Sequence, residues 1–231
     1  MNAFFNPANI ARTYSDPVAW LILAVDLFPI YAVLVFGWGA APLVFLYWLE
    51  NLVIGAVTLA RMMATAMQEH PVGLIAMLFI GPFFIVHYGM FCFVHGVFVH
   101  VFASMNTGGS PDFLGPVSLI QSALNSAPHM TLFILAIIAL QAFLFVRDFL
   151  MRGQYRETTI QEEMMAPYGR ILVLHFGLFV GMAAMIALGQ PMLGILALIL
   201  LRAVWGIFLT MRRRMHLDRK IEEKVDAPSP I

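Results

Sequence analysis

The longest apolar stretch of the chain is GLIAMLFIGPFFIVHYGMFCFVHGVFVHVFAS, residues 73–104, and it contains no Asp, Glu, Lys or Arg. A helix that rises about 1.5 Å per residue needs about 20 mostly apolar residues to cross roughly 30 Å of hydrocarbon. The stretch therefore predicts a membrane-spanning helix. It also carries His87, His95 and His100, three side chains that lipid does not solvate.

This stretch is longer than one crossing requires, because its length as a helix would be about 48 Å. Gly81-Pro82 is the expected position of a kink or break, since proline lacks a backbone donor and clashes with the preceding turn. Residues 83–104 are then the main span.

The composition of the whole chain supports a membrane protein. Of its 231 residues, 61% are hydrophobic and 11% are charged, whereas soluble domains have about 45–50% apolar and about 25% charged residues. The one cysteine, Cys92, excludes an internal disulfide framework. Residues 1–17 lack the apolar core of a removed signal peptide.

The apolar segments predict an all-α, polytopic membrane protein with six transmembrane helices. These segments cover residues 18–37, 42–64, 73–104, 129–150, 168–188 and 191–211. We expect a cytoplasmic N-terminal segment (1–17), a transmembrane domain (18–212) and a basic, polar tail (213–231). Between the spans, residues 116–124 predict a short interfacial helix, and residues 151–167 are expected to lie in water.

The basic residues predict the orientation. Twelve of the thirteen Lys and Arg residues fall at span ends assigned to one side, and the other, Arg202, lies within the sixth span. Cytoplasmic loops are enriched in Lys and Arg, so both termini are expected to be cytoplasmic. The main partner expected is the lipid bilayer. The one-sided distribution and the attraction of the basic tail to anionic lipid explain the basic residues. Nucleic acid is therefore not an expected partner.

Five of the six expected spans carry an ionisable side chain at membrane depth. These are Asp26, Glu50, His87, His95, His175 and Arg202. A charged group near a helix centre costs about 2.5–3.5 kcal/mol on insertion scales, so such groups usually face the bundle interior and mark function.

Charge balance favours a metal ion in this interior. Asp26 and Glu50 supply two negative charges against one positive charge from Arg202, and a buried site tolerates the excess only by protonation or by holding a cation. Imidazole and carboxylate groups suit zinc, iron or manganese. The predicted ligands are His87, His95, His175 and Glu50. The groups expected to orient ligands or balance charge are Asp26, Asn51 and Arg202.

The spacing along the helix allows two ions in this site. His87 and His95 are eight residues apart, or about 12 Å along a helix. They could serve two ions roughly 3.5–4 Å apart, with Glu50 as a bridge.

Three other interpretations compete with a metal site. His87 and His175 could be the axial ligands of a b-type haem. Glu50 and the histidines could titrate in an ion- or proton-coupled transporter. The protein could also be a scaffold, in which Arg202 and a carboxylate form an ion pair that only fixes helix packing.

Small residues mark helix faces that approach a neighbour closely. Gly177 and Gly181 form a GxxxG pair, and Gly89 and Gly96 share a stripe seven residues apart. Such faces pack against another helix, either within the bundle or in a homodimer.

Three segments resemble a bacterial family of six-helix membrane proteins of unknown function. These segments are YWLENLVIGAV (47–57), HYGMFCFVHGVFV (87–99) and PYGRILVLHFG (167–177). The resemblance covers most of residues 18–212 and implies that Glu50, Asn51, His87, His95 and His175 belong to the family pattern. Together with the expected orientation, it implies a location in a bacterial inner membrane. It implies no activity. TMRRRMHLD (210–218) departs from the expected spacing, so His216 and Asp218 are not included.

Overall fold

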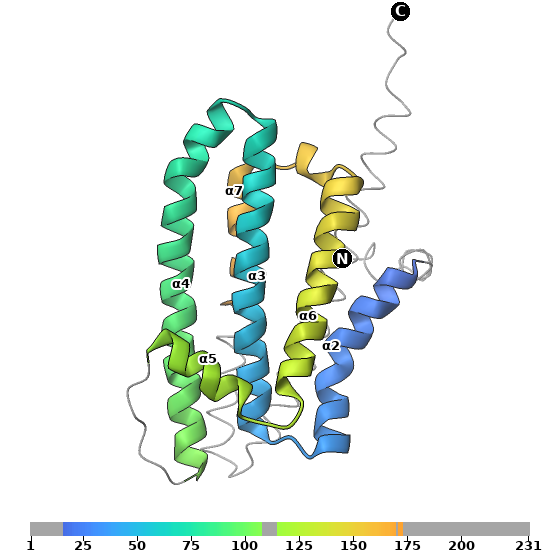
Figure 1. Cartoon of the computed structure of the whole chain (residues 1–231), viewed down its shortest axis with the longest axis vertical. Coiled ribbons are helices and arrows are strands. Elements are labelled where there is room, and N and C mark those ends of the chain that lie inside the picture. The colour runs from blue at the N-terminus through green and yellow to red at the C-terminus, as the bar shows by residue number, and fades with distance from the viewer. Residues whose placement is uncertain (1–15, 108–114, 170, 173–231) are drawn as a thin grey trace, which may run out of the picture.

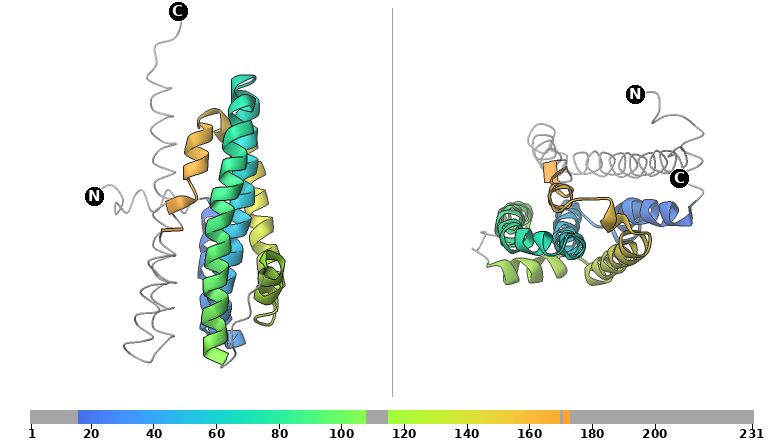
Figure 2. Two further views of the ribbon diagram at one scale, coloured as in Figure 1. Left: turned by 90° about the vertical axis from the view of Figure 1, so that its left-hand side faces the viewer. Right: turned by 90° about the horizontal axis from the view of Figure 1, so that it is seen from above.

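The computed structural model describes residues 16–107, 115–169, 171 and 172, and the elements in these ranges are all helical (Figures 1 and 2). In chain order they are α2 (Pro17–Phe36), α3 (Ala40–Gln68), α4 (Val72–Thr107), α5 (Pro116–Leu124), α6 (Met130–Leu144), the π-helix η1 (Phe145–Met151), the 3-10 helix η2 (Gln154–Arg156) and α7 (Ile160–Met165). The all-α prediction is confirmed for these residues.

Four helices are long and apolar enough to cross a membrane. They are Pro17–Phe36, Ala40–Gln68, Val72–Val101 and Met130–Met151, and they match the first four predicted spans. The predicted spans 168–188 and 191–211 lie outside the described residues, apart from the first few positions of the former. The chain is therefore a membrane protein by composition and helix length, while the six-span count and the orientation stay predictions.

Helix α3 is the centre of the described bundle. Figure 1 shows it between α4 and α6, and all nine residues from Leu43 to Asn51 are buried. Helix α5 lies across this bundle and buries Leu119 and Ala123 against it. The short helix predicted at residues 116–124 is confirmed. Because α3 is surrounded on several sides, four of its polar residues are buried: Glu50, Asn51, Thr58 and Thr65.

Helix α4 continues through Gly81 and Pro82 without interruption. Of the predicted kink or break, the break is excluded, and Figure 1 shows the first turns of α4 inclined relative to the rest. Proline is tolerated within membrane helices because neighbouring groups and local adjustments satisfy the freed carbonyl. His87 and His95 both follow Pro82 and lie on this one helix, as the predicted main span 83–104 already implied.

The segment 151–167, expected to lie in water, folds into η2 and α7, which pack on α3. Ile160 and Glu163 are only 3% and 5% exposed, while most other residues of the segment are partly or fully exposed. Its place in water stays a prediction. A capping box starts α7, because Thr159 accepts from the Glu162 N–H and the Glu162 carboxylate accepts from the Thr159 N–H.

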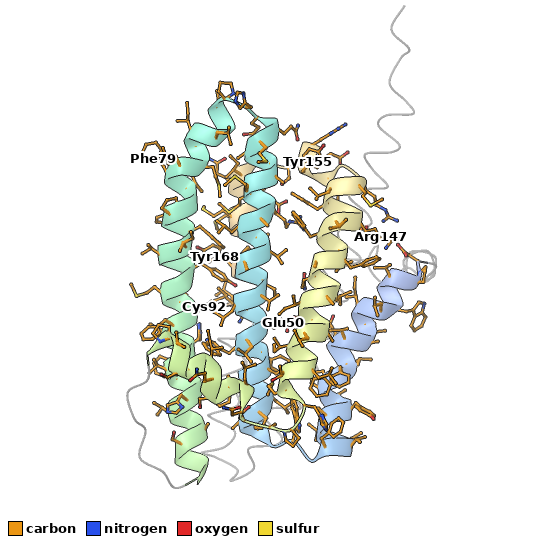
Figure 3. All side chains as sticks on the ribbon, viewed as in Figure 1. Glu50, Phe79, Cys92, Arg147, Tyr155 and Tyr168 are labelled. Carbon is orange, nitrogen blue, oxygen red and sulfur yellow. The ribbon has the colours of Figure 1, made fainter. Side chains whose placement is uncertain are left out.

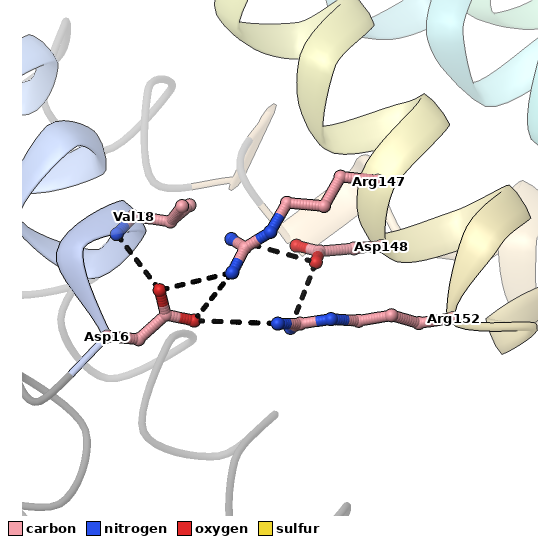
Figure 4. A network of polar contacts seen from close by, with 5 residues as sticks. All are labelled: Asp16, Val18, Arg147, Asp148 and Arg152. Carbon is pink, nitrogen blue, oxygen red and sulfur yellow. Dashed lines mark hydrogen bonds and ion pairs between the residues drawn. The ribbon is translucent and has the colours of Figure 1, made fainter.

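Charged residues connect the start of α2 with the end of α6 (Figure 4). Asp16 caps α2 by accepting from the Val18 N–H at 3.0 Å, and it pairs with Arg147 at 3.2 Å. Arg152 pairs with Asp148 at 3.1 Å and lies 3.9 Å from Asp16. We call this side of the bundle the Arg147 end and the opposite side the Trp38 end.

Substituting Asp16 with asparagine tests this network. Burial opposes ionisation of Asp16, but the Val18 N–H and the guanidinium groups of Arg147 and Arg152 outweigh it and lower the pKa of the carboxyl. The ionised form therefore contributes stability above the usual aspartate pKa of about 4, and this contribution is lost as pH falls through the lowered value.

An asparagine at this position keeps the helix cap but removes the charge. We expect Asp16→Asn to lower the free energy of unfolding by about 1 kcal/mol at neutral pH. In thermal unfolding of the detergent-solubilised protein, this difference should shrink as the pH falls below the usual aspartate pKa of about 4 and through the lowered value. A difference in stability between the wild type and Asp16→Asn that stays the same at every pH would contradict the expectation.

Candidate functional site

Helices α3 and α4 meet through two reciprocal contacts between an aromatic ring and a glycine. The Trp48 ring of α3 lies against Gly96 of α4, and its Nε1 donates to the Cys92 carbonyl at 2.7 Å. In the other direction, the Tyr88 ring of α4 lies against Gly55 of α3.

The Tyr88 hydroxyl donates to the Asn51 carbonyl at 3.0 Å. In both contacts the accepting carbonyl is four residues before the glycine that the ring covers. The predicted close approach at Gly96 is therefore confirmed, and its partner is α3. The other glycine of the predicted stripe, Gly89, has no neighbouring atom of the described residues where a Cβ would lie.

Tyr168, which follows α7 in the chain, contacts two residues of α4 and so brings a third segment to the site. Its hydroxyl lies 2.8 Å from Nδ1 of His87, and its ring meets the Tyr88 ring edge to face at 6.1 Å between centroids. Described residues of the three segments that carry the family resemblance, although far apart in sequence, thus meet: Asn51 of α3 contacts Tyr88 of α4, which contacts Tyr168. Figure 3 shows Tyr168, Cys92 and Glu50 along this part of the bundle.

The remaining polar residues of the site differ in burial. Glu50 and Asn51 are 3% and 8% exposed, whereas His87, His95 and Asp26 are half-buried. Nδ1 of His95 lies 2.9 Å from the Phe91 carbonyl of its own helix. A carbonyl only accepts, so this contact requires the proton on Nδ1 and places the lone pair of the neutral ring on Nε2.

A family model matches residues 8–225, which is most of the chain. The chain belongs to DUF6498, a family of unknown function. The predicted resemblance to a family of unknown function is thereby confirmed. Neither the curated proteins nor the solved structures contain a match to this DUF6498 chain.

The predicted metal ligands of this DUF6498 protein are placed only in part. Glu50, His87 and His95 lie on α3 and α4, while His175 and the charge-balancing Arg202 fall outside the described residues. Within residues 16–107, 115–169 and 171–172, no three side chains among His, Cys, Asp and Glu are grouped to hold a metal ion. Glu50, His87 and His95 therefore do not make a three-ligand site by themselves.

A second polar cluster of the DUF6498 chain lies nearer the Arg147 end. Arg61 of α3 binds Glu163 of α7 through two hydrogen bonds, Nε to Oε2 and Nη2 to Oε1, the latter at 3.0 Å. The Arg61 guanidinium also lies over the Phe149 ring, 4.2 Å from its centroid. This cluster fastens α7 to α3 and so holds the segment that leads to Tyr168.

Sequence reasoning missed both Tyr168 and this Arg61 cluster. A usable signal was present in TTIQEEMM (158–165), where a capping box precedes apolar residues at helical spacing. That pattern predicts a short amphipathic helix. It does not reveal which basic residue, 102 positions earlier, would receive Glu163.

Proposed function

We propose that this membrane protein binds a divalent transition metal in its interior, with Glu50, His87, His95 and His175 as ligands. The observation that carries the proposal is the use of Nδ1 by His87 and His95, the two proposed histidine ligands that the structure describes. His87 meets Tyr168 and His95 meets the Phe91 carbonyl through this atom. Metal-binding histidines commonly engage one ring nitrogen in this way, which fixes the ring and directs the other nitrogen to the metal.

Glu50 supports the same proposal through its position. It is a carboxylate on the most deeply packed helix, 3% exposed, at a depth within about one residue of that of His95. A carboxylate beside neutral imidazoles forms a ligand set that zinc, iron and manganese accept. Asp26, Asn51 and Arg202 would orient the ligands or balance charge around them.

The spacing on α4 determines how the ligands are divided. His87 and His95 are about 12 Å apart along one helix, so each would serve a different ion, with Glu50 bridging two neighbouring ions. His175 follows Tyr168 by seven residues, which is the spacing of one face in the expected span 168–188. His175 is therefore the ligand proposed to join His87.

Metal content is the test. The protein is purified from membranes without added metal, and zinc, iron and manganese are measured per chain by mass spectrometry. We expect a stoichiometric transition metal in the wild type and a loss of at least half of it in both His87→Ala and His175→Ala. His100→Ala is the matched control, because His100 lies near the end of α4 and outside the proposed ligand set.

A folded, monodisperse wild type without metal would overturn the proposal. Equal metal in His87→Ala, His175→Ala and His100→Ala would overturn the ligand assignment. An absorption spectrum of the same sample is an independent test. An intense Soret band would show that the protein binds haem in place of the proposed metal ions.

A further inference from the structure

The His87 ring lies among aromatic rings and has one hydrogen-bond partner in the described part of the chain. Phe83 stacks on it at 5.2 Å between centroids, and Phe91 meets it edge to face at 5.1 Å. The partner is the Tyr168 hydroxyl, 2.8 Å from Nδ1. Phenyl rings hold the plane of an imidazole but do not distinguish its nitrogens from its carbons. The polar contact with Tyr168 therefore decides between two ring orientations that differ by a half-turn.

Tyr168 is held in place because its segment is anchored on both sides. Ile160 precedes it and Ile171 follows it, and these side chains are only 3% and 5% exposed. Both belong to one buried cluster with Met62 of α3 and Phe84 of α4, and the Tyr168 ring packs against this cluster. Figures 1 and 2 show α7 beside α3, in agreement with the contacts between these helices. The apolar contacts thus fasten the segment to the two helices that carry Glu50 and His87.

The ion pair between Arg61 and Glu163 adds direction to this attachment. Hydrophobic burial is not directional, so apolar contacts alone let a short helix rotate or slide on its neighbour. A guanidinium that donates two hydrogen bonds to one carboxylate fixes both the distance and the orientation of the pair. Arg61 makes such a contact, from Nε to Oε2 and from Nη2 to Oε1 of Glu163. Glu163 precedes Tyr168 by five residues, so the pair fixes where Tyr168 begins.

We propose that Tyr168 is a positioning residue for His87, and that the Arg61–Glu163 pair sets the position of Tyr168. The inference rests on the proposed metal site, in which His87 is a ligand. It adds a control on that site. The affinity for metal depends on whether α7 is docked on α3, and this docking lies nearer the Arg147 end than the ligands do.

The direction of the hydrogen bond follows from the role of the ring. A neutral imidazole carries one proton, so Nε2 has a lone pair for a metal ion only when Nδ1 holds that proton. Nδ1 of His87 then donates to the Tyr168 oxygen, as Nδ1 of His95 donates to the Phe91 carbonyl. A phenol that donated to Nδ1 would place the proton on Nε2 and exclude metal from this ring.

Tyr168→Phe tests this hydrogen bond, because it removes the hydroxyl and keeps the ring. Tyr155→Phe is the matched control, since the Tyr155 hydroxyl belongs to the same segment but accepts from Nε of Arg156 at 3.0 Å. Metal-free proteins labelled with ¹⁵N-histidine are compared by NMR at about pH 8, where free imidazole is neutral. The resonances of His87 are those missing from His87→Ala. We expect the Nδ1–H tautomer to predominate in the wild type and in Tyr155→Phe, and to fall by at least half in Tyr168→Phe.

Zinc affinity is the second readout, measured by titration in competition with a chelator of known affinity. Tyr168→Phe should weaken zinc binding by about 10–100-fold, the usual effect of removing the hydrogen-bond partner of a metal-binding histidine. Tyr155→Phe should stay within about twofold of the wild type. Arg61→Ala should change the His87 tautomer and the zinc affinity in the same direction as Tyr168→Phe, whereas Arg156→Ala should change neither. If Arg61→Ala does not fold, Glu163→Gln, which weakens the same pair, replaces it.

The outcomes separate this inference from the proposed metal site. An unchanged His87 tautomer in Tyr168→Phe, or a wild type without a proton on Nδ1, would overturn the role of Tyr168. A change in Tyr168→Phe that Arg61→Ala does not reproduce would overturn the role of the Arg61–Glu163 pair. Unaltered zinc affinity in Tyr168→Phe would overturn the control by α7 while leaving the metal site in place. A wild type that shows the expected tautomer but binds no metal would overturn the metal site and support the positioning of His87 by Tyr168.

Discussion

Replacing Gly96 with alanine is expected to lower the free energy of unfolding by about 1–3 kcal/mol, which is typical of overpacking in a tight core. A Cβ at Gly96 would lie 2.6 Å from Cζ2 of Trp48. The indole cannot move aside without loss, because Trp48 is 5% exposed and is bound to the Cys92 carbonyl.

Gly89→Ala is the matched control for Gly96→Ala. Both glycines lie within α4, seven residues apart, but a Cβ at Gly89 meets no atom of the described residues within 4 Å. Alanine favours a helix over glycine by roughly 0.5–1 kcal/mol, so Gly89→Ala should be neutral or stabilising. Thermal unfolding in detergent, with tryptophan emission as a second signal, compares the variants. Equal stability of the two would show that the contact between Trp48 and Gly96 does not limit helix approach.

The second large effect concerns the pair formed by Arg61 and Glu163. Arg61→Ala leaves the Glu163 carboxylate, whose side chain is 7% exposed, without its two guanidinium hydrogen bonds. Breaking a buried pair costs about 3–5 kcal/mol. We expect about 2–3 kcal/mol, because Arg61 keeps 28% exposure and water weakens its share of the interaction.

Two further variants make this expectation specific. Arg156→Ala removes an exposed arginine and should change stability by less than about 0.5 kcal/mol. Changing both Arg61 and Glu163 to methionine should recover most of the lost stability, because it leaves no uncompensated charge. Hydrogen exchange across residues 153–165 should rise in Arg61→Ala and not in Arg156→Ala. If Arg61→Ala behaves like Arg156→Ala, α7 is held by its apolar contacts alone.

Sequence reasoning could predict the spans because hydrocarbon imposes a length and a composition on each one. The expected segments 18–37, 42–64 and 129–150 lie close to Pro17–Phe36, Ala40–Gln68 and Met130–Met151. At Pro82 the sequence left a kink or a break open, because the local rule against proline assumes a helix in water, where the freed carbonyl gains an alternative partner; α4 runs through Pro82 as one helix. In lipid the intact helix is the better solution.

The residues of the site were predictable in part. Position along a span gives the depth of a side chain in the membrane, but not the direction in which that side chain points from the helix axis. Depth indicated Glu50, which is buried, and His87, which contacts Tyr168. The contact between His95 and its own helix could not be foreseen from spacing. Tyr168 was missed because a tyrosine near a span end is ordinarily an interfacial residue. The charge balance with Arg202 stays a prediction, since that residue lies outside the described part of the chain.

The paired contacts between α3 and α4 also bear on how this family varies. Each ring both fills the space over a glycine and donates to the carbonyl one turn before it, so ring and glycine depend on one another. A smaller ring at position 48 or 88 leaves a void that a larger residue at 96 or 55 could occupy. In relatives, the ring and the glycine of each pair should therefore change together. A substitution of only one residue of a pair should be rare.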